Sequence, residues 1–472
     1  MAMVSFITDV IVIGAGLSGL QTAIGIQAAG HSCVVLEATD RVGGKTLSIK
    51  SDPNDKKGDG VVDVGAAWVN DSNQSEIWKL FDKYDIGAII QRATGTSFLQ
   101  ADNGIVIPHP YHEQPLDDAS AEEQRRVYEA IQTEIDAMDL ERPERSPRAR
   151  ELDSVTFADY ARKIGPHIGE QLASSAMASL LGVEADEVSA LYAINYIKSG
   201  GGVHIIASDE KDGAQYIRGR RGMQAIAQGL ASDLEPGTVR LNTVVKSVQQ
   251  TAKGTYRVTS AKGAVFEAKH VVVSVPTSLY RTIDFSPPLP KLKQRLSAST
   301  SMGNYNKVVL VFDRPWWREA GLSGVMTTTS ADLGPILFTR DTSSEKDGQW
   351  SISCFIAGDR ARSWAKQPKA KRLKSVLDQF RAVFSTAASV PQPVAVHERI
   401  WSHDPFFRGA PSPVMGPGVL TTIGSDTLRK PVGKIHFVGT ETAIVWKGYM
   451  DGAIRSGYRG AEEVVARLRA EE

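Results

Sequence analysis

The chain has 472 residues, more than one ordinary hydrophobic core accommodates, so two domains are expected. Hydrophobic residues make up 42% of the sequence and charged residues 23%, which is typical of a folded globular protein and excludes a disordered one. Lysine plus arginine equals aspartate plus glutamate at 54 each, so the charge balance indicates neither a nucleic-acid partner nor an anionic membrane surface.

The first forty residues predict a strand, a helix and a second strand. DVIVIG is an apolar run typical of a buried parallel strand, and GLSGLQTAIGIQAAG has helical spacing and ends at Gly30. SCVVLE then repeats the strand pattern, which completes a βαβ unit.

The middle of the chain alternates between helical and strand-rich segments. Residues 110–151 are charged and contain prolines, and their spacing predicts solvated helices, with helical spacing continuing to about residue 200. Residues 211–234 predict a turn and a helix. The runs TVRLNTVVKSVQQ, TYRVTS and AVFEAKHVVVSVP predict a small antiparallel layer, and NKVVLVFDRPWW and WSISCFIAG predict a second β series.

The end of the chain repeats the pattern of its beginning, a strand followed by a glycine-containing turn and a helix. KIHFV predicts a strand, and GTETAIVWKGYMDGAIRSG leads from it into a helix. We therefore expect both chain ends to share one sheet, with a second domain inserted between them. The glycines, the acid and the aromatic residues of this junction exceed what an ordinary turn needs, which indicates a binding function.

The two cysteines and the hydropathy of the sequence indicate the cellular compartment in which the protein is expected. Cys33 and Cys354 lie in strand-like runs and are predicted to be buried free thiols in a reducing compartment. No run approaches the roughly 18 apolar residues of a membrane span, and the N-terminus lacks the charged-then-apolar pattern of a signal peptide. We therefore expect a cytoplasmic protein with no membrane or nucleic-acid partner.

A glycine-rich turn follows the first strand. Its GxGxxG pattern opens the predicted helix, and Glu37 stands eighteen residues after its last glycine, at the end of the second strand. Such glycines let backbone N–H groups approach a pyrophosphate, and the acid accepts hydrogen bonds from ribose hydroxyls. The alternative, an ordinary tight turn, does not account for strand, helix and acid together. The binding residues predicted in this turn are Gly14, Ala15, Gly16, Ser18 and Gly19.

Two further segments favour a flavin dinucleotide over a nicotinamide one. RVGGK follows shortly after Glu37 and brings two adjacent glycines and a positive charge to the same phosphates. A nicotinamide enzyme has no need of this second loop. GAAW supplies small residues suited to lying against a flat ring. The contacts predicted from these segments are Ala38, Gly44, Lys45, Gly65, Ala66, Ala67 and Trp68.

Together these motifs resemble the flavin-dependent amine oxidases of the monoamine oxidase family. The resemblance runs nearly end to end, through the glycine-rich turn, RVGGK, GAAW, VVVSVP, NKVVLVFDRPWW, and GTET with GYMDGA. Within the family, LGVEADEVSALYAINYIKSG, SDEKDGAQYIR and GTETAIVWKGYMDGAIRSG are most similar to a fungal subgroup that oxidises fumonisins, which are long-chain polyol primary amines.

The resemblance implies a mixed α/β (α+β) fold, with a FAD-binding domain of the glutathione-reductase type and an inserted substrate domain, as in monoamine oxidases. The FAD-binding domain is expected to comprise residues 1–86, 218–290 and 400–472. The substrate-binding domain is expected to comprise residues 87–217 and 291–399. A homodimer is expected from the resemblance alone.

The resemblance also implies FAD contacts at the C-terminal junction. Glu441 is expected beside the ribityl chain and phosphate, and the Met450 N–H beside a carbonyl of the ring. Reduced flavin gathers negative charge at N1 and O2, which a helix N-terminus stabilises by up to roughly 2 kcal/mol. The resemblance adds Gly439, Tyr449 and Val245 to the FAD contacts.

Three residues are expected to serve the reaction itself. Lys307 opens the apolar strand VVLVF, where a lysine is rarely buried unless it is paired or functional. The resemblance implies that Lys307 holds a water at flavin N5 and assists reoxidation by O2; otherwise it points to solvent. Trp401 is expected to pack near this lysine and the flavin, or to be a core tryptophan. Tyr449 is expected to form one wall of an aromatic cage around the substrate amine.

The segment RGAPSP, residues 408–413, departs from the family pattern in two places. Ala410 stands where some members have a cysteine bonded to FAD, so FAD is expected to be bound non-covalently. Pro411 replaces the second aromatic residue of the cage, so the cage is half built or is completed by another residue. The incomplete cage favours a wider mouth and a bulkier amine than a small arylalkylamine.

The expected reaction is oxidative deamination of a primary amine, such as the long-chain amino-polyol fumonisin, by O2. The products are a ketone or aldehyde, ammonia and hydrogen peroxide. The alternatives are a polyamine oxidase or C–C desaturase on the same fold, and a protein that keeps FAD for structure. No metal site is expected, because the nine histidines are scattered and His109 and His112 share a proline-rich loop with no helix to align them.

Overall fold

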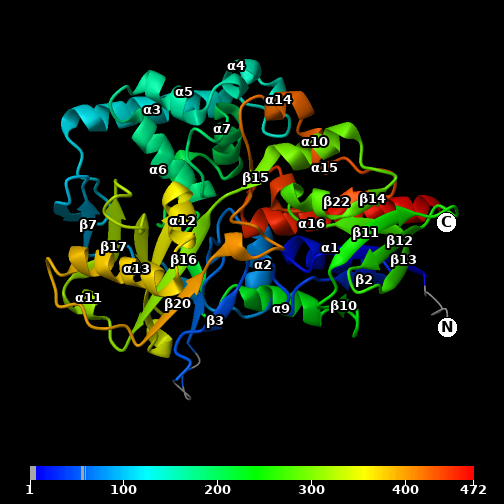
Figure 1. Ribbon diagram of the computed structural model, residues 1–472, viewed down its shortest axis with the longest axis horizontal. Helices are drawn as coiled ribbons and strands as arrows, with labels where there is room; N and C mark the ends of the chain where they lie inside the picture. Colours follow the sequence, from blue (N-terminus) through cyan, green and yellow to red (C-terminus); the bar gives the residue numbers. More distant parts are fainter. Residues whose placement is uncertain (1–6, 55–57, 59, 472) are drawn as a thin grey trace.

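Two large sheets and a tier of helices make up the computed structural model, which describes residues 7–54, 58 and 60–471 (Figure 1). One sheet carries both chain ends, and the other is formed by central segments of the chain. The helical tier lies at the top of the view in Figure 1, over both sheets. The mixed α/β architecture predicted from the sequence is therefore confirmed.

The first sheet has eight strands in the order β10-β2-β1-β13-β12-β11-β14, with β22 pairing to β13. β1 and β22 both run parallel to β13, so the two chain ends share this sheet, as expected. Val10, Val12 and Ile11 of β1 are fully buried, because helices or other side chains cover both faces of its parallel part. The strands are β1 (Ile7–Ile13), β2 (Cys33–Leu36), β10 (Val239–Arg240), β11 (Val245–Gln250), β12 (Tyr256–Ser260), β13 (Val265–Val273), β14 (Asp284–Ser286) and β22 (Ile435–Phe437).

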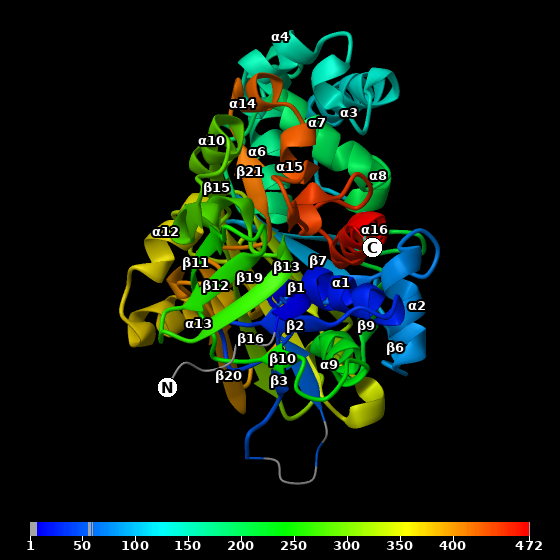
Figure 2. The same cartoon turned by 90° about the vertical axis from the view of Figure 1, so that its right-hand side faces the viewer.

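Two helices pack against each other on this sheet, α1 (Leu17–Ala28) and α16 (Met450–Glu471). Their approach depends on glycines, since a Cβ on Gly25 would lie 2.5 Å from that of Ala461, and one on Gly457 would lie 2.7 Å from Gln21. α1 begins just after β1, and α16 is the next α-helix after β22, from which the 3-10 turn η5 (Thr440–Thr442) separates it. Residues at the N-termini of both helices line the same cavity. α2 (Ser75–Lys83) and α9 (Gln224–Ser232) complete this layer (Figure 2).

The second sheet has seven strands in the order β20-β16-β19-β18-β17-β7-β8. Lys307 on β16 stands opposite Phe355 on β19, and their neighbours Val308 and Cys354 point to the other face, into a hydrophobic core. The strands are β7 (Thr96–Gln100), β8 (Val106–Pro110), β16 (Tyr305–Phe312), β17 (Leu322–Thr328), β18 (Phe338–Asp341), β19 (Trp350–Ala357) and β20 (Ala395–Arg399). The helices α11 (Trp316–Glu319), α12 (Gly358–Ala365) and α13 (Lys369–Phe384) pack beside it.

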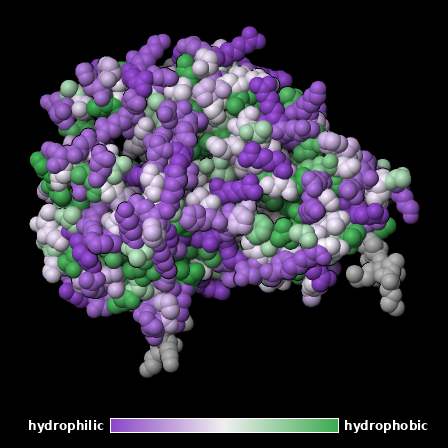
Figure 3. All heavy atoms as spheres, in the orientation of Figure 1, coloured by the Kyte–Doolittle hydropathy of each residue, from purple (hydrophilic) through white to green (hydrophobic). Residues whose placement is uncertain are grey.

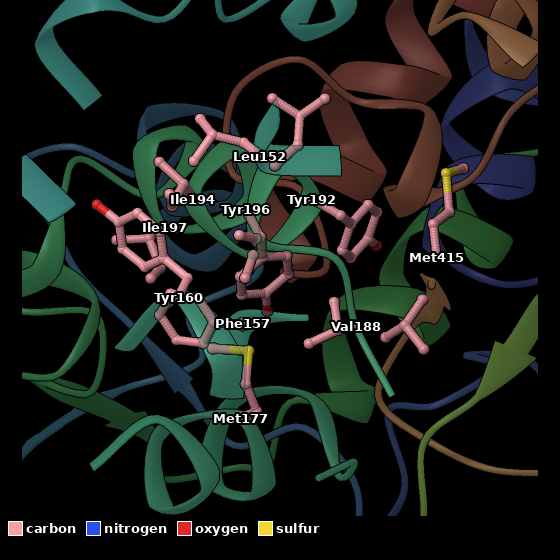
Figure 4. Packing of buried hydrophobic residues seen from close by; sticks show 14 of the residues in the cluster. Leu152, Phe157, Tyr160, Met177, Val188, Tyr192, Ile194, Tyr196, Ile197 and Met415 are labelled. Carbon is pink, nitrogen blue, oxygen red and sulfur yellow. The ribbon is translucent and has the colours of Figure 1, made fainter. Parts of the chain in front are cut away.

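The helical tier is built around α7 (Ala190–Ser199), whose residues are nearly all buried. Tyr192, Ile194 and Tyr196 of this helix pack against Phe157 and Met177 in the core drawn in Figure 4. This confirms the helical content predicted before residue 200. The other helices of the tier are α3 (Asp118–Ala137), α4 (Ala149–Ser154), α5 (Phe157–Ile164), α6 (Gly169–Leu181), α8 (Val203–Ile206), α10 (Lys291–Ser299), α14 (Val419–Ile423) and α15 (Asp426–Arg429).

Short strands and 3-10 turns link these layers. Two strands, β9 (Ile217–Gly219) and β8, differ from the sequence prediction. Residues 211–234 contain β9 before their helix, and three residues are too few to show a period. His109 lies on β8 and not in a loop; β8 is an edge strand, where prolines are tolerated. The short strands are β3 (Ser48–Lys50), β4 (Val61–Asp63), β5 (Trp68–Val69), β6 (Ala88–Ile90), β15 (Thr300–Met302) and β21 (Pro413–Met415). The 3-10 turns are η1 (Pro143–Arg145), η2 (Thr277–Thr282), η3 (Glu345–Asp347), η4 (Trp401–His403) and η5 (Thr440–Thr442).

The burial of the two cysteines and the hydropathy of the surface match what the sequence predicts for a folded globular protein. Cys33 and Cys354 are both buried and unpaired, as predicted. The face in Figure 3 mixes hydrophilic and hydrophobic residues, and hydrophilic ones cover much of the helical tier. Across the described ranges, no helix combines the length and apolar character needed to cross a membrane.

Candidate active site

A cavity of about 760 Å³ is lined by residues of the first sheet, the second sheet and the helical tier. Of the site residues predicted from the sequence, all but Ala15 and Gly19 line it. The lining residues that were predicted are Gly14, Gly16, Ser18, Glu37, Ala38, Gly44, Lys45, Gly65, Ala66, Ala67, Trp68, Val245, Lys307, Trp401, Gly439, Glu441, Tyr449 and Met450. Segments far apart in the sequence thus meet at one cavity.

The two predicted residues that do not line the cavity hold the glycine-rich turn in shape. The Ala15 N–H donates to Glu37 Oε2 at 2.7 Å, which ties the turn to the end of β2. A Cβ on Gly19 would lie only 2.1 Å from the carbonyl oxygen of Gly14, so no larger residue fits there. Ala15 and Gly19 are therefore placed behind the turn, and the other three predicted residues of the turn face the cavity.

The glycines of the two loops leave room for a diphosphate. A Cβ on Gly16 would meet only the Cα of Gly44, at 4.0 Å, so a methyl group there would occupy the cavity. Helix α1 begins at this point with no side-chain cap and no acid in its first turn, so its N–H donors remain for an anion. This pair of glycine loops at a helix N-terminus fits the dinucleotide predicted from the sequence.

One cation and one acid face each other at this end of the cavity. Burial lowers the pKa of Lys45 to about 8, and the charge of Glu441 opposes that shift. Burial raises the pKa of Glu441, while Lys45 lowers it. Glu441 Oε1 also accepts from the Thr277 N–H at 2.9 Å. Lys45 therefore supplies the counter-charge that a diphosphate requires, and Glu441 is held in a fixed position beside it.

The start of α16 is fixed at the cavity wall. Thr440 Oγ1 donates to the carbonyl oxygen of Tyr449 at 2.7 Å, just before Met450, the first residue of the helix. The Asp451 carboxylate accepts from the N–H groups of Glu76 and Ile77 at 2.8 and 3.0 Å, so this acid serves α2. The positive end of a 22-residue helix thus opens at the cavity.

Lys307 is buried in the cavity wall. Its ammonium donates to the backbone oxygens of Asp63 at 2.9 Å and Gly65 at 2.8 Å. Its Nζ lies 5.3 Å from the ring centroid of Trp68 and 5.1 Å from that of Phe355. Burial lowers the pKa of Lys307 to about 8, and the Asp63 carboxylate opposes the shift. An ammonium has three N–H donors, so one remains for a water or an oxygen molecule in the cavity.

The aromatic residues around the C-terminal junction brace Tyr449. The Trp446 ring stands edge-on to Tyr449 at 5.0 Å and donates from Nε1 to the Asn73 carbonyl at 2.8 Å. Lys447 Nζ donates to Asn195 Oδ1 at 2.5 Å, in the core of the helical tier. Neither Trp446 nor Lys447 lines the cavity. Their role in the motif is thus to hold the turn from which Tyr449 reaches the cavity.

Trp401 lies in the same wall as Ala410 and Pro411. Its ring stands edge-on to Phe407 at 5.1 Å, and the Arg399 guanidinium lies 4.2 Å from its centroid. Trp401 is 3% exposed and belongs to a small hydrophobic cluster with Phe407 and Ala410, so it is a core residue and a cavity residue at once.

The sequence did not identify the aromatic residues opposite these walls. The Tyr196 ring lies 6.1 Å from that of Tyr449 and is inclined to it by 31°. Phe338 stacks on Phe355 at 4.4 Å, and Tyr305 stands at a steep angle to Phe355 at 5.8 Å. All five line the cavity. Tyr196 therefore places a second ring beside Tyr449 although Pro411 occupies the position expected for that ring, and Tyr305, Phe338 and Phe355 form a further aromatic group in the lining.

The signals for these residues in the sequence were weak. Tyr196 lies on a helix buried on all sides, so no amphipathic stripe shows which of its residues faces a cavity. Phe338 lies on a strand of four residues. Only Phe355 had a usable signal, since alternation within SISCFIAG puts it on the face opposite Cys354.

Apart from Lys307, the part of the lining that comes from the helical tier and the second sheet is apolar or polar without charge, with one exception, Arg340 on β18. A second lining arginine, Arg408, is exposed and lies in the segment between Trp401 and Ala410. In the part of the chain that the structure describes, no group of three or more histidine, cysteine, aspartate or glutamate residues could hold a metal ion. The uncharged residues of this lining include Gln114, Tyr128, Leu172, Ser175, Ala176, Ser179, Leu180, Gln215, Thr327 and Thr328.

Comparison with known proteins gives the same family over nearly the whole chain. A sequence profile described as "Flavin containing amine oxidoreductase" matches residues 17–465. The chain is 30% identical over 476 residues to a probable flavin-containing monoamine oxidase A of Dictyostelium discoideum, an alignment that covers 98% of this chain and 99% of that protein. It is 30% identical over 469 residues to flavin-containing amine oxidase B of Mus musculus, covering 97% of this chain and 86% of that protein.

Solved structures of two oxidases share the fold. Wild-type putrescine oxidase bound to putrescine superposes with a TM-score of 0.89 at 27% identity, covering 98% of this chain and 100% of that chain. Cyclohexylamine oxidase from Brevibacterium oxydans IH-35A superposes with a TM-score of 0.88 at 27% identity, with the same coverage. The chain belongs to the family of flavin-containing amine oxidoreductases and is an FAD-dependent amine oxidase.

Proposed function

We propose that this protein oxidatively deaminates a primary amine on a long, polar-substituted carbon chain, such as an amino-polyol of the fumonisin type. Oxidation by O2 gives an imine and hydrogen peroxide, and water hydrolyses the imine to the ketone or aldehyde and ammonia. FAD, held at the two glycine loops and the N-termini of α1 and α16, would supply the redox chemistry that couples oxidation of the amine to reduction of O2. The protein's own residues position the amine and exclude bulk water. The backbone oxygens of Asp63 and Gly65 hold the Lys307 ammonium in the cavity wall.

The observation that carries this proposal is the composition of the cavity beyond Tyr449. Tyr196 and Tyr449 present neighbouring rings, and the lining continues onto α3, α6, β17 and the loops that carry Gln114 and Gln215, with leucine and alanine interspersed with serine, threonine and glutamine. Apolar surface favours a carbon chain, and uncharged hydroxyl and amide groups favour a chain that carries hydroxyls. A small arylalkylamine would leave most of this polar lining without a partner.

The charges of the lining disfavour a diamine substrate. Within the described residues, the acids that line the cavity are Glu37 and Glu441, and both belong to the segments that fit the dinucleotide. The second ammonium of a diamine would therefore be buried without a carboxylate partner, which is costly. A polyamine oxidase remains the alternative function, and the substrate screen below tests it directly.

An anaerobic bleaching screen with the purified holoenzyme tests the proposal. We expect long-chain primary amines with a hydroxyl near the amine to bleach the flavin faster than benzylamine, and putrescine and spermidine to bleach it slowest. Ammonia and hydrogen peroxide should appear in equal amounts once air is admitted. Fastest bleaching by a diamine would favour the alternative, and a flavin that no amine bleaches would contradict any oxidase function.

The reaction is expected to speed up as the pH rises. An amine with a pKa near 10.4 must lose a proton before it can be oxidised, at a cost of about 4.6 kcal/mol at pH 7. No acid near Tyr449 stabilises the ammonium form, and the aromatic walls disfavour it. We expect the rate constant of flavin reduction at saturating amine to rise about tenfold per pH unit from pH 6 and to level off at about pH 8 to 9, where the bound amine has lost its proton. A rate that is flat from pH 5 to pH 9 would contradict a neutral-amine mechanism.

FAD is expected to leave the protein on denaturation. Ala410 lines the cavity where a cysteine would be needed for a thioether, and its methyl group cannot form one. Precipitation with acid should therefore release all the yellow colour into the supernatant. Colour that stays with the precipitated chain would show a covalent link through some other residue and would contradict the non-covalent assignment.

A further inference from the structure

Arg340 is a charged side chain in the part of the cavity lining that β18 contributes. It lies on β18 of the second sheet, whereas the glycine loops that fit the dinucleotide lie at the edge of the first sheet. Of the other cations in the lining, Lys45 faces Glu441, Lys307 is held by two backbone oxygens, and Arg408 is exposed in the segment before Ala410. An amine oxidase gains nothing from a cation that repels its substrate's ammonium, so Arg340 needs another explanation.

The Arg340 side chain is held in a fixed position. Its Nε lies 3.3 Å from Asp209 Oδ2, and its Nη1 donates to the Thr339 carbonyl at 3.1 Å. Its guanidinium lies 5.2 Å from the ring centroid of Phe338. Only a quarter of the side chain is exposed. A guanidinium has five N–H donors, and among the described residues Nη2 has no hydrogen-bond partner, so part of the planar fork is left for a ligand.

Asp209 anchors Arg340 without cancelling its charge in the cavity. The Asp209 carboxylate is buried, does not line the cavity and accepts a further hydrogen bond from the Tyr111 hydroxyl. Arg340 does line the cavity. A ligand in the cavity therefore meets the N–H donors of the arginine, while the acid lies behind it.

The surroundings of Arg340 favour a carboxylate over a phosphate. The nearby lining residues Phe338, Tyr305 and Thr328 carry no charge, so this end of the cavity offers a single positive charge. One guanidinium fork matches the geometry and charge of a carboxylate, whereas phosphate sites commonly add further cations or a helix N-terminus. We propose that Arg340 forms a subsite for a carboxylate carried by the amine substrate, remote from the carbon that is oxidised.

This inference rests on the proposed amine oxidation and adds a substrate class to it, amines that carry a distant carboxylate. The test compares ω-amino carboxylates of increasing length with n-alkylamines of the same length, using the holoenzyme. In the wild type, kcat/KM should favour the carboxylate at one preferred length. In Arg340→Met this preference should fall by about 10- to 100-fold, mainly through KM, with alkylamine oxidation little changed. Arg340→Lys should fall between the two, and Arg408→Met, a change of another lining arginine, should keep the preference.

A binding measurement removes the dependence on turnover. Octanoate should raise the melting temperature of the wild-type holoenzyme and compete with the substrate amine, and Arg340→Met should weaken octanoate binding at least about tenfold but leave octanol binding unchanged. A wild type that prefers alkylamines at every length and does not bind octanoate would overturn the subsite, as would equal losses for both substrate series in Arg340→Met. Octanoate binding that depends on Arg340 without oxidation of any amine would uphold the subsite and overturn the proposed function instead.

Discussion

Replacing Lys307 by methionine is expected to slow the oxidative half-reaction at least about 100-fold while changing the reductive half-reaction less than about threefold. The Lys307 ammonium is bound to the Gly65 carbonyl oxygen, in the GAAW segment of the cavity wall. A negative charge that develops on an oxygen molecule about 4 Å from this ammonium would be stabilised by up to about 4 kcal/mol in a protein environment. Methionine fills a similar volume but carries neither the charge nor the donors. Stopped-flow absorbance, with anaerobic reduction and reoxidation followed separately, measures the two rates.

The charge state of Lys307 gives this prediction a second readout. Its pKa is lowered to about 8, so the ammonium predominates below pH 8 and is lost above it. In the wild type the oxidative rate constant should be flat below about pH 8 and fall above it, and in Lys307→Met this fall should vanish. Lys291→Met, at an exposed lysine outside the cavity, is the control. Equal slowing of both half-reactions would mean that Lys307 supports the structure of the site and not the reaction with O2.

The cofactor half of the site could be predicted from the sequence because its requirements are local. A backbone that must approach a phosphate needs glycine at fixed offsets, and Gly14, Gly16 and Gly44 leave that signature within thirty-one residues. The second glycine loop follows Glu37 directly, so one short stretch contains both loops and the acid. Local chemistry of this kind survives in the sequence without knowledge of the fold.

Apart from Tyr449, the substrate half could not be predicted, because its side chains come from separate elements and each has an ordinary structural explanation in the sequence. Tyr196 is also a core residue of the helical tier, as Figure 4 shows, and Phe355 is also one residue of a buried strand. Arg340 lies on a four-residue strand beside Phe338. Only the strand order of the second sheet and the packing of α7 bring these residues to one cavity. That information is tertiary, and no local pattern contains it.

The same contrast explains the Trp446–Lys447 pair. The pair lies within the junction that carries the predicted FAD contacts, yet neither side chain lines the cavity, and their hydrogen-bond partners are Asn73 and Asn195 in other segments. A motif therefore marks the whole turn that must keep its shape, and not only the atoms that touch a ligand. The residues that fix Tyr449 are as specific to the motif as Tyr449 itself.

Replacing Gly16 by alanine is expected to raise the Kd for FAD at least about 100-fold without unfolding the protein. Gly16 has φ −72° and ψ 174°, a conformation that alanine adopts freely, and its Cβ would meet only the Cα of Gly44 at 4.0 Å. The methyl group would instead occupy the space between the two loops where the diphosphate fits. Overpacking at a site that cannot relax costs about 3 kcal/mol, which corresponds to about 100-fold in affinity. Fluorescence titration of the apoprotein with FAD measures the Kd.

A second glycine separates this effect from a general loss of stability. Gly263 lies in the turn between β12 and β13 with φ +84° and nothing within 4 Å of a Cβ, so alanine there is strained but touches no neighbour. Gly263→Ala should lower the free energy of unfolding by about 1 to 2 kcal/mol and leave the Kd for FAD unchanged. Gly16→Ala should do the reverse, with an apoprotein melting temperature close to that of the wild-type apoprotein. If Gly16→Ala still binds FAD with wild-type affinity, the diphosphate does not lie between these loops, and the cavity edge at the N-terminus of α1 is not the cofactor cradle.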